Sequence, residues 1–187
     1  MLFQETALDG VFIIELERRE DHRGHFARAF CRREFDAHGL NPVVAQANVA
    51  RSTHQGTVRG MHFQYPPHAE AKLVRATRGA ILDVAVDLRP ESPTYLRHVA
   101  VELSAEDQRG LYLPERFAHG YQTLEEGAEV LYLTSVPYAP EFEAGLSPFD
   151  PGLGITWPLP PSEVSAKDAG ARRLDQIGDE LKRRMRA

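Results

Sequence analysis

The sequence predicts a single all-β domain, a sandwich or barrel of short strands. Short runs rich in β-branched and aromatic residues recur along the chain, and turn residues separate them. A chain of 187 residues is long enough for one domain with a sizeable core. Strands are expected at 10–16, 43–50, 56–64, 72–78, 80–88, 97–103, 110–113, 117–124 and 129–136. This spacing is typical of β-sandwiches and β-barrels.

Less regular segments complete the predicted domain. A charged turn is expected at 18–24, and Phe26 and Phe30 flank another short strand. Residues 33–38 predict a short helix that Gly39 stops, and residues 171–185 form the only strongly helical stretch. We therefore expect one domain over 1–187, with its core at about 10–160 and a helical tail at about 161–187.

Composition excludes several classes of protein. The 22 basic and 27 acidic residues give a net charge of −5, and no long single-sign run precedes the basic stretch 182–186. This pattern does not resemble a nucleic-acid-binding footprint. No signal peptide or membrane span is predicted. The one cysteine, Cys31, can form no internal disulfide, which fits a reducing compartment, so a cytoplasmic protein is expected.

Four ionisable side chains interrupt the apolar strand-like runs. Arg59 and His62 lie within 56–64, Lys72 begins the next strand, and His119 lies within 117–124. Ionisable groups are rarely buried without partners, so a single histidine of this kind would be a core residue with its hydrogen bonds satisfied. Several such interruptions together predict one polar pocket inside a β-barrel.

Strand alternation predicts which side chains share a face. His62 should lie on the same face as Gly60 and Val58, and Arg59 on the opposite face with Met61 and Phe63. A glycine beside the histidine leaves room for a ligand.

The strand at 43–50 carries two amides. Gln46 and Asn48 alternate in the sequence and should therefore point to one face. Polar amides on an inward face require hydrogen-bond partners.

A metal site is the first chemistry to consider. A barrel metal site needs several histidines and a carboxylate, but only His62 and His119 fit that pattern. Gln64 stands where a second histidine would be, and Lys72 adds a positive charge that repels a metal ion. We therefore expect neither a metal nor another cofactor. A nucleophile is also not indicated, because no serine or cysteine carries a local signature.

Proton transfer is the chemistry that the residue types favour. A histidine oriented by a carboxylate is a general base, a tyrosine is a general acid, and a lysine can stabilise an enolate. The candidates are His62, Asp168, Tyr132 and Lys72. Structural alternatives remain for three of them: Tyr132 as a core tyrosine, Asp168 as a helix N-cap and Lys72 as half of an ion pair.

The motifs resemble those of dTDP-4-dehydrorhamnose 3,5-epimerases. The resemblance rests on Gly-Thr-Val-Arg-Gly-Met-His-Phe-Gln at 56–64, Ala-Lys-Leu-Val at 71–74, Phe-Ala-His-Gly at 117–120 and Ser-Ala-Lys-Asp at 165–168, with further motifs in the same order. It runs from about Gly10 to Asp168, nearly the whole chain. It implies an all-β cupin jelly-roll barrel, a homodimer that exchanges N-terminal strands, no metal, and epimerisation of a nucleoside-diphosphate 4-keto-6-deoxy sugar.

The resemblance also implies roles for individual residues. His62 would be the base held by Asp168, Tyr132 the acid on the opposite face of the sugar, and Lys72 the cation at the C4 oxygen. Binding roles would fall to Arg59, Gln46 and Asn48 at the diphosphate, to Arg23, Phe26, Tyr138, Glu143 and Lys167 at the nucleotide, and to His119 in the sugar pocket.

Five residues depart from the family pattern: Arg28, Ala47, Arg116, Pro148 and Phe149. Arg28 occupies a position where the family usually has a glutamate facing the base, so it would alter the preference for thymine or else pair with Glu34.

Two other functions remain open. They are an epimerase acting at C3 or C5 alone, and a non-catalytic cupin that binds sugar nucleotides.

Overall fold

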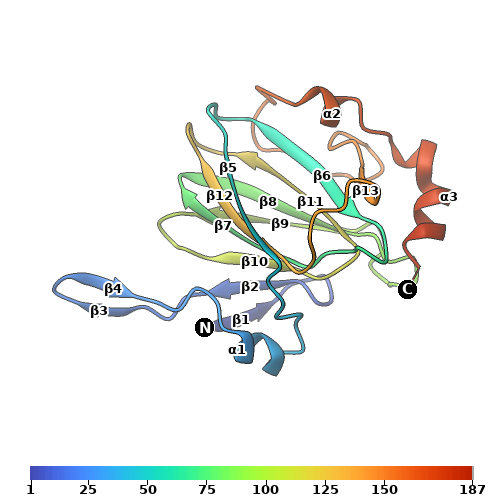
Figure 1. Ribbon diagram of the computed structural model, residues 1–187. Helices are drawn as coiled ribbons and strands as arrows, with labels where there is room; N and C mark the ends of the chain where they lie inside the picture. The colour runs from blue at the N-terminus through green and yellow to red at the C-terminus, as the bar shows by residue number, and fades with distance from the viewer. Residues whose placement is uncertain (187) are drawn as a thin grey trace.

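The structure is a computed structural model that describes residues 1–186, and two antiparallel sheets form most of it (Figure 1). The six-stranded sheet has the order β1 (Leu2–Glu5), β2 (Phe12–Glu15), β10 (Gly110–Leu113), β7 (Lys72–Arg78), β12 (Glu129–Thr134) and β5 (Gln46–Arg51). The five-stranded sheet has the order β13 (Glu143–Gly145), β6 (Val58–Gln64), β11 (Phe117–Thr123), β8 (Ala80–Asp87) and β9 (His98–Ser104). The all-β jelly-roll prediction is confirmed.

The apolar faces of the sheets explain why they close on each other. Val74, Ile81, Ala85, Leu111 and Val130 are fully buried and belong to one core cluster drawn from both sheets. Burying a Val, Leu or Ile side chain contributes roughly 1.5–3 kcal/mol, so this cluster stabilises the closed barrel.

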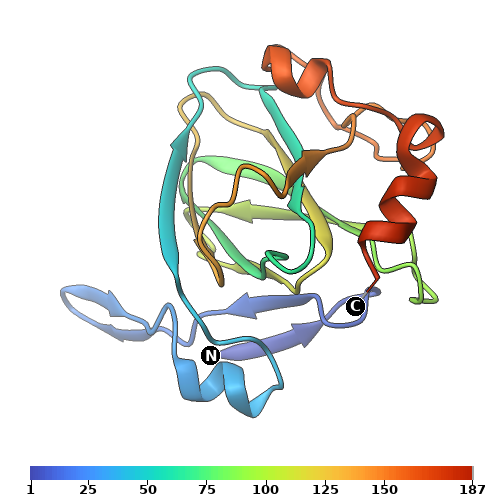
Figure 2. The ribbon, with the colours of Figure 1, turned by 45° about the vertical axis from the view of Figure 1, so that its right-hand side comes forward.

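In the described part of the chain, three helices lie outside the sheets. They are α1 (Arg32–Ala37), α2 (Ala166–Ala169) and α3 (Leu174–Arg184). Figure 2 shows α2 and α3 beside the barrel wall that contains β6. Ile177 and Leu181 of α3 pack in a second core cluster with Met61 and Phe63 of β6. Among the described residues, no helix is long and apolar enough to cross a membrane.

The N-terminal region differs in part from the prediction. Residues 18–24 form most of a hairpin, β3 (Arg19–Asp21) and β4 (Gly24–Phe26), that projects from the body (Figure 1). Residues 27–30 form no strand, so the predicted strand between Phe26 and Phe30 is wrong. Phe30 instead packs against Phe35 of α1, with ring centroids 4.9 Å apart.

The inner face of the six-stranded sheet carries a set of polar side chains in register. Thr134 lies opposite Lys72 on one side and opposite Gln46 on the other. Tyr132, two residues before Thr134, lies opposite Asn48. Because alternate residues share a face, these side chains point the same way, as predicted for Gln46 and Asn48.

The predicted faces of β6 are wrong for Arg59. Met61 and Phe63 are buried in the cluster with α3, whereas Arg59 lines the same cavity as His62. Two residues three apart in a regular strand point to opposite faces, so the strand cannot be regular between them.

A bulge between β6 and β11 accounts for this difference. His62 pairs with His119, whereas Arg59 pairs with Tyr121, so two residues of β6 face one residue of β11. A bulge of this kind shifts the alternation by one position, which turns Arg59 to the cavity side.

Two facing glycines make the bulge sterically possible. Gly60 has φ +113°, and a Cβ on it would lie 2.6 Å from Gly120 Cα and from His119 O. A Cβ on Gly120 would in turn lie 2.7 Å from Arg59 O. The backbones of β6 and β11 therefore approach closely only because neither residue has a side chain.

Gly60→Ala should destabilise the protein by about 3 kcal/mol or more, because it adds a backbone clash to an unfavourable φ. Gly154→Ala is the matched control, since Gly154 has φ +61° but no heavy atom within 4 Å of the added Cβ. We expect the control to cost only about 1 kcal/mol. Chemical unfolding of both variants measures the difference, and equal losses would contradict the importance of the close approach.

Candidate active site

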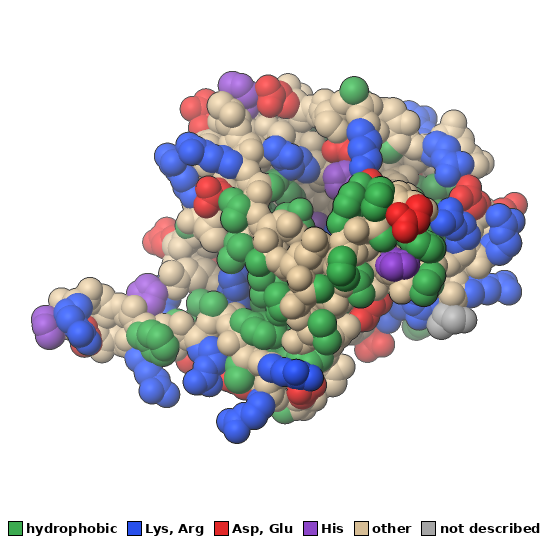
Figure 3. Space-filling model, in the orientation of Figure 1, with side chains coloured by type: hydrophobic (Ala, Val, Ile, Leu, Met, Phe, Trp, Pro, Cys, Tyr) green, Lys and Arg blue, Asp and Glu red, His purple; other side chains and the backbone are tan. Residues whose placement is uncertain are grey.

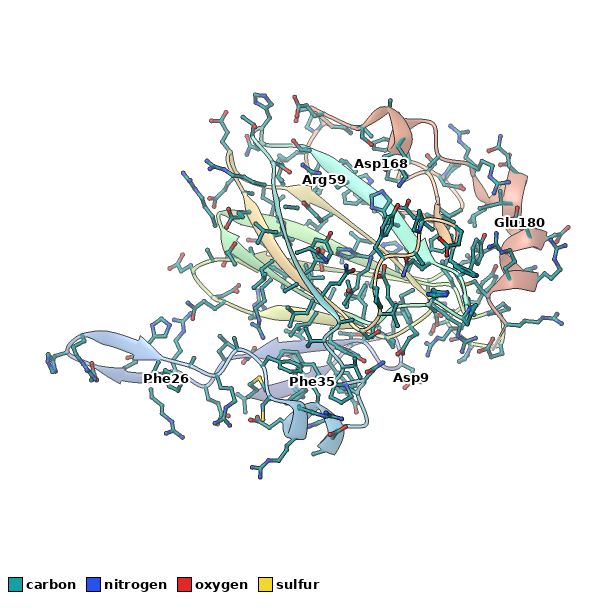
Figure 4. The ribbon with its side chains drawn as sticks, viewed as in Figure 1. Asp9, Phe26, Phe35, Arg59, Asp168 and Glu180 are labelled. Carbon is teal, nitrogen blue, oxygen red and sulfur yellow. The ribbon has the colours of Figure 1, made fainter. Side chains whose placement is uncertain are left out.

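A histidine and a carboxylate form a short contact at the wall of the barrel. His62 Nε2 lies 2.7 Å from Asp168 Oδ1. The side chain of His62 is 35% exposed and that of Asp168 is 6% exposed. The histidine therefore reaches the cavity while its partner is shielded from water. Figure 4 shows Asp168 and Arg59 close together at one end of the barrel.

The segment before α2 positions Asp168 beside β6. Val164 forms a parallel bridge with Val58, and the Val58 N–H donates to the carbonyl of Glu163 at 2.9 Å. Ser165 caps α2 by accepting a hydrogen bond from the Asp168 N–H. Asp168 is thus inside the helix and not its N-cap, so its carboxylate is free to accept from His62.

Hydrogen bonds keep this carboxylate ionised. Burial acts to raise the pKa of Asp168, but hydrogen bonds and charge from His62 outweigh it, so the pKa lies below its ordinary value of 3.8. The Gly60 N–H also donates to Asp168 Oδ2 at 3.2 Å. An ionised carboxylate can fix both the ring orientation and the tautomer of the histidine.

Two cavities meet at the histidine. One has a volume of about 710 Å³ and includes Arg59 and His119 in its lining, and the other has a volume of about 390 Å³. Both are lined by His62, Lys72 and Tyr132. Figure 3 shows the hollowed face of the molecule on which they open. The predicted polar pocket inside the barrel is therefore present.

The four candidates for proton transfer lie together but on different walls. His62 belongs to the five-stranded sheet, and Asp168 lies behind it on α2. Lys72 and Tyr132 belong to the six-stranded sheet, on neighbouring strands. A ligand in the cavity would lie between a histidine on one side and an ammonium and a phenol on the other.

Lys72 has an acidic partner that the sequence analysis missed. Its Nζ lies 3.0 Å from Glu70 Oε1, and both side chains are nearly buried. The ion-pair alternative for Lys72 is thus correct, although Lys72 still lines both cavities. An acidic residue two positions before a buried lysine was the available signal.

Tyr132 is half-buried and remains protonated to high pH. Burial raises the pKa of its hydroxyl, the negative charge of Glu70 raises it further, and Arg59 lowers it. The hydroxyl can therefore act as a proton donor at neutral pH.

His119 also has a carboxylate partner that was missed. His119 Nε2 lies 2.7 Å from Asp83 Oδ1, and both side chains are buried. Asp83 stands in the apolar run of β8, where an acid needs a partner.

The second cavity carries the remaining polar candidates. Gln46, Asn48, Tyr138 and Glu143 line it. The Tyr138 hydroxyl donates to Glu143 at 2.7 Å, and Lys167 Nζ donates to the other Glu143 oxygen at 2.5 Å. These contacts link the loop after β12 to α2 across the cavity rim.

Three candidates do not reach the cavity of their own chain. Arg23 pairs with Asp21 on the projecting hairpin, and Phe26 on that hairpin is 68% exposed. Figure 4 shows Phe26 far from Arg59 and Asp168. Arg28 Nη1 lies 3.0 Å from Glu34 Oε1. Of the two predictions for Arg28, contact with the base or an ion pair with Glu34, the structure has the ion pair.

The other departures from the family pattern lie outside both cavities. Ala47 is on the exposed face of β5, and Phe149 is 41% exposed. Pro148 O accepts from the indole N–H of Trp157. Arg116 has φ +65°, a conformation that glycine adopts readily, and it donates to Met185 O at 2.9 Å.

Within residues 1–186, no three His, Cys, Asp or Glu side chains gather as metal ligands. Metal independence stays a prediction, based on the cation Lys72 and on Gln64, whose amide donates to His68 O at 2.9 Å and accepts from the Ala139 N–H.

The sequence matches the profile of dTDP-4-dehydrorhamnose 3,5-epimerase over residues 5–176. The chain belongs to this family. It is 43% identical to the dTDP-4-dehydrorhamnose 3,5-epimerase of Salmonella typhimurium over 180 residues, which cover 94% of this chain and 97% of that one. It is 38% identical to a dTDP-4-dehydrorhamnose 3-epimerase of Streptomyces niveus, over 96% of this chain and 86% of the relative.

Solved structures of the epimerase family have the same fold. The dTDP-6-deoxy-D-glucose-3,5-epimerase of Legionella pneumophila, crystallised with dTDP-4-keto-L-rhamnose, superposes with a TM-score of 0.90. The two chains are 37% identical, and the match covers 96% of each. The fold is therefore the cupin jelly roll that the resemblance implied.

Asp168→Asn should change how stability depends on pH. A lowered folded-state pKa means that the carboxylate stabilises the fold above about pH 4, and that this contribution is lost as the pH falls through the folded-state value. We expect the wild type to exceed the variant by about 1–3 kcal/mol at pH 6 and by less near pH 3. Unfolding with urea over this range gives both curves. The exposed Asp36→Asn is the control, and parallel curves for wild type and Asp168→Asn would contradict the prediction.

Proposed function

We propose that the protein epimerises dTDP-4-dehydro-6-deoxy-D-glucose to dTDP-4-dehydro-L-rhamnose, by removing and returning protons at C3 and C5. The observation that carries this proposal is the base and acid pair on opposite walls of one cavity: His62 on β6 and Tyr132 on β12. Inverting a carbon requires a proton to leave one face of the sugar and return to the other. Two proton-transfer groups on facing walls of a cavity can act on the two faces of a sugar bound between them.

The ketone at C4 makes the chemistry feasible. A proton on C3 or C5 is acidic because the C4 oxygen can take the charge as an enolate. His62 would remove the proton as general base, with Asp168 stabilising the imidazolium that forms. Lys72 would donate to the enolate oxygen, and one such donor is worth about 10²–10³ in rate.

Return of the proton falls to Tyr132. Its raised pKa keeps the hydroxyl protonated, so it can donate to the carbanion from the wall opposite His62. The lost proton is replaced from solvent. Each carbon that has been epimerised in deuterated water would therefore carry one deuterium.

The rest of the lining suits a nucleoside diphosphate. Arg59, Gln46 and Asn48 would hold the diphosphate, since a guanidinium and two amides supply donors to phosphate oxygens. Tyr138, Glu143 and Lys167 would border the nucleotide, and His119 the sugar.

His62→Ala should abolish both turnover and deuterium incorporation at C3 and C5, because no other base lies at that position. Tyr132→Phe should abolish turnover but retain some exchange at carbons that His62 can still deprotonate. The measurement is NMR of dTDP-4-keto-6-deoxyglucose incubated in deuterated water. Wild-type-like epimerisation by His62→Ala would end the assignment of the base.

Epimerisation at C3 alone is the second candidate. The Streptomyces niveus relative is a dTDP-4-dehydrorhamnose 3-epimerase at 38% identity, so the family contains enzymes of both kinds. The same NMR experiment separates them, because a 3-epimerase leaves product deuterium at C3 only. A protein that binds the nucleotide without exchange at either carbon would be a non-catalytic cupin.

We infer that the protein works in the cytoplasm as a homodimer with exchanged N-terminal segments. The hairpin β3–β4 supports the exchange, because it extends from the body and carries Arg23 and the exposed Phe26 away from their own cavity. In an exchanged dimer these residues would reach the nucleotide site of the other protomer. Each site would then combine His62 of one chain with the hairpin of the other.

Mixing two inactive variants tests the exchange. In an exchanged dimer, a His62→Ala chain supplies an intact hairpin to the cavity of an Arg23→Ala/Phe26→Ala chain. We expect refolding the two variants together to restore up to about a quarter of wild-type activity, from one complete site in each mixed dimer. The separate variants refolded alone are the controls. Mixed samples no more active than the controls would contradict the exchange of hairpins between protomers.

A further inference from the structure

Glu70 places a negative charge where the proposed reaction needs a positive one. It lies in the loop between β6 and β7, two residues before Lys72. Its carboxylate oxygen is 3.0 Å from Lys72 Nζ, and its side chain is only 13% exposed. Burying a carboxylate is costly, and a carboxylate beside Lys72 also weakens the field that stabilises an enolate. A carboxylate with these two costs is expected to contribute to function in another way.

The geometry of the lysine suggests this role. A lysine side chain is a flexible four-carbon stem that ends in an ammonium with three donors. The ion pair with Glu70 restricts the direction of the stem, while Lys72 still lines both cavities. Both Glu70 and Lys72 line the 390 Å³ cavity, together with His62 and Tyr132.

We propose that Glu70 is a positioning residue for the epimerisation, which directs the Lys72 ammonium toward the ketone oxygen. This inference rests on the proposed function. Glu70 need not touch the substrate, because it acts through Lys72.

Glu70 has a second effect, on the acid. Its charge adds to burial in raising the pKa of Tyr132, so it helps to keep the phenol protonated. The other ionisable groups that line the two cavities are Arg59, His62, Lys72, His119, Tyr121, Tyr138, Glu143, Glu163, Lys167 and Asp168. Of these, Arg59 opposes Glu70.

Three variants separate position from charge. Glu70→Ala loses both the acceptor and the charge, so kcat should fall by about tenfold or more while KM changes little, as expected when a transition-state contact is lost. Glu70→Gln keeps an acceptor and should restore most of kcat near neutral pH. The alkaline limb of the pH profile of kcat for Glu70→Gln should move to lower pH, because removing the negative charge lowers the pKa of Tyr132. Glu91→Ala removes a carboxylate paired with Arg116 outside both cavities and should behave as wild type.

A double-mutant cycle tests whether Glu70 acts through Lys72. If it does, adding Glu70→Ala to Lys72→Met should cause little further loss of deuterium exchange. Thermal unfolding shows whether each variant is folded, and Glu70→Gln keeps the test decisive if Glu70→Ala is not. A wild type without exchange would refute the proposed function itself. If the wild type is active, two results would overturn the role of Glu70 alone. One is a Glu70→Ala variant with the kcat and pH profile of the wild type, and the other is fully additive losses in the double-mutant cycle.

Discussion

The close approach of β6 and β11 at Gly60 and Gly120 is the constraint on which the site depends. It permits the bulge that turns Arg59 to the same side as His62, while Met61 and Phe63 remain in the core with α3. The Gly60 N–H at this bulge also donates to Asp168. One steric requirement therefore places a guanidinium, an imidazole and its carboxylate partner around a single cavity.

The two sheets contribute different polar side chains to the cavity. The five-stranded sheet presents His62 and His119, each held by a carboxylate, and the six-stranded sheet presents Lys72, Tyr132 and two amides in register. Strand pairing sets the spacing along each wall, and the core between the sheets sets the distance across. The cavity therefore has a defined polarity, and the segment between β13 and α2 completes its lining with residues 162–165.

Much of this could be predicted from the sequence, because strand periodicity and the polar interruptions of apolar runs are local signals. They indicated the barrel, the tail helix, the inward amides and the pocket around His62. The partners Asp83 and Glu70 were missed because pairing depends on which side chains meet in space. The predicted face of Arg59 was wrong because a bulge depends on pairing with the neighbouring strand. The positions of Arg23 and Phe26 depend on a hairpin whose direction no local pattern encodes.

The position of Asp168 in the sequence affects the order in which the parts of the site are synthesised. Every strand of both sheets precedes residue 146, whereas the carboxylate that orients His62 arrives more than twenty residues later, on α2. The strands of the barrel are thus synthesised before the carboxylate partner of His62. The packing of Ile177 and Leu181 against β6 follows later still. The His62–Asp168 contact and the packing of α3 on β6 therefore require residues that are synthesised after every strand of both sheets.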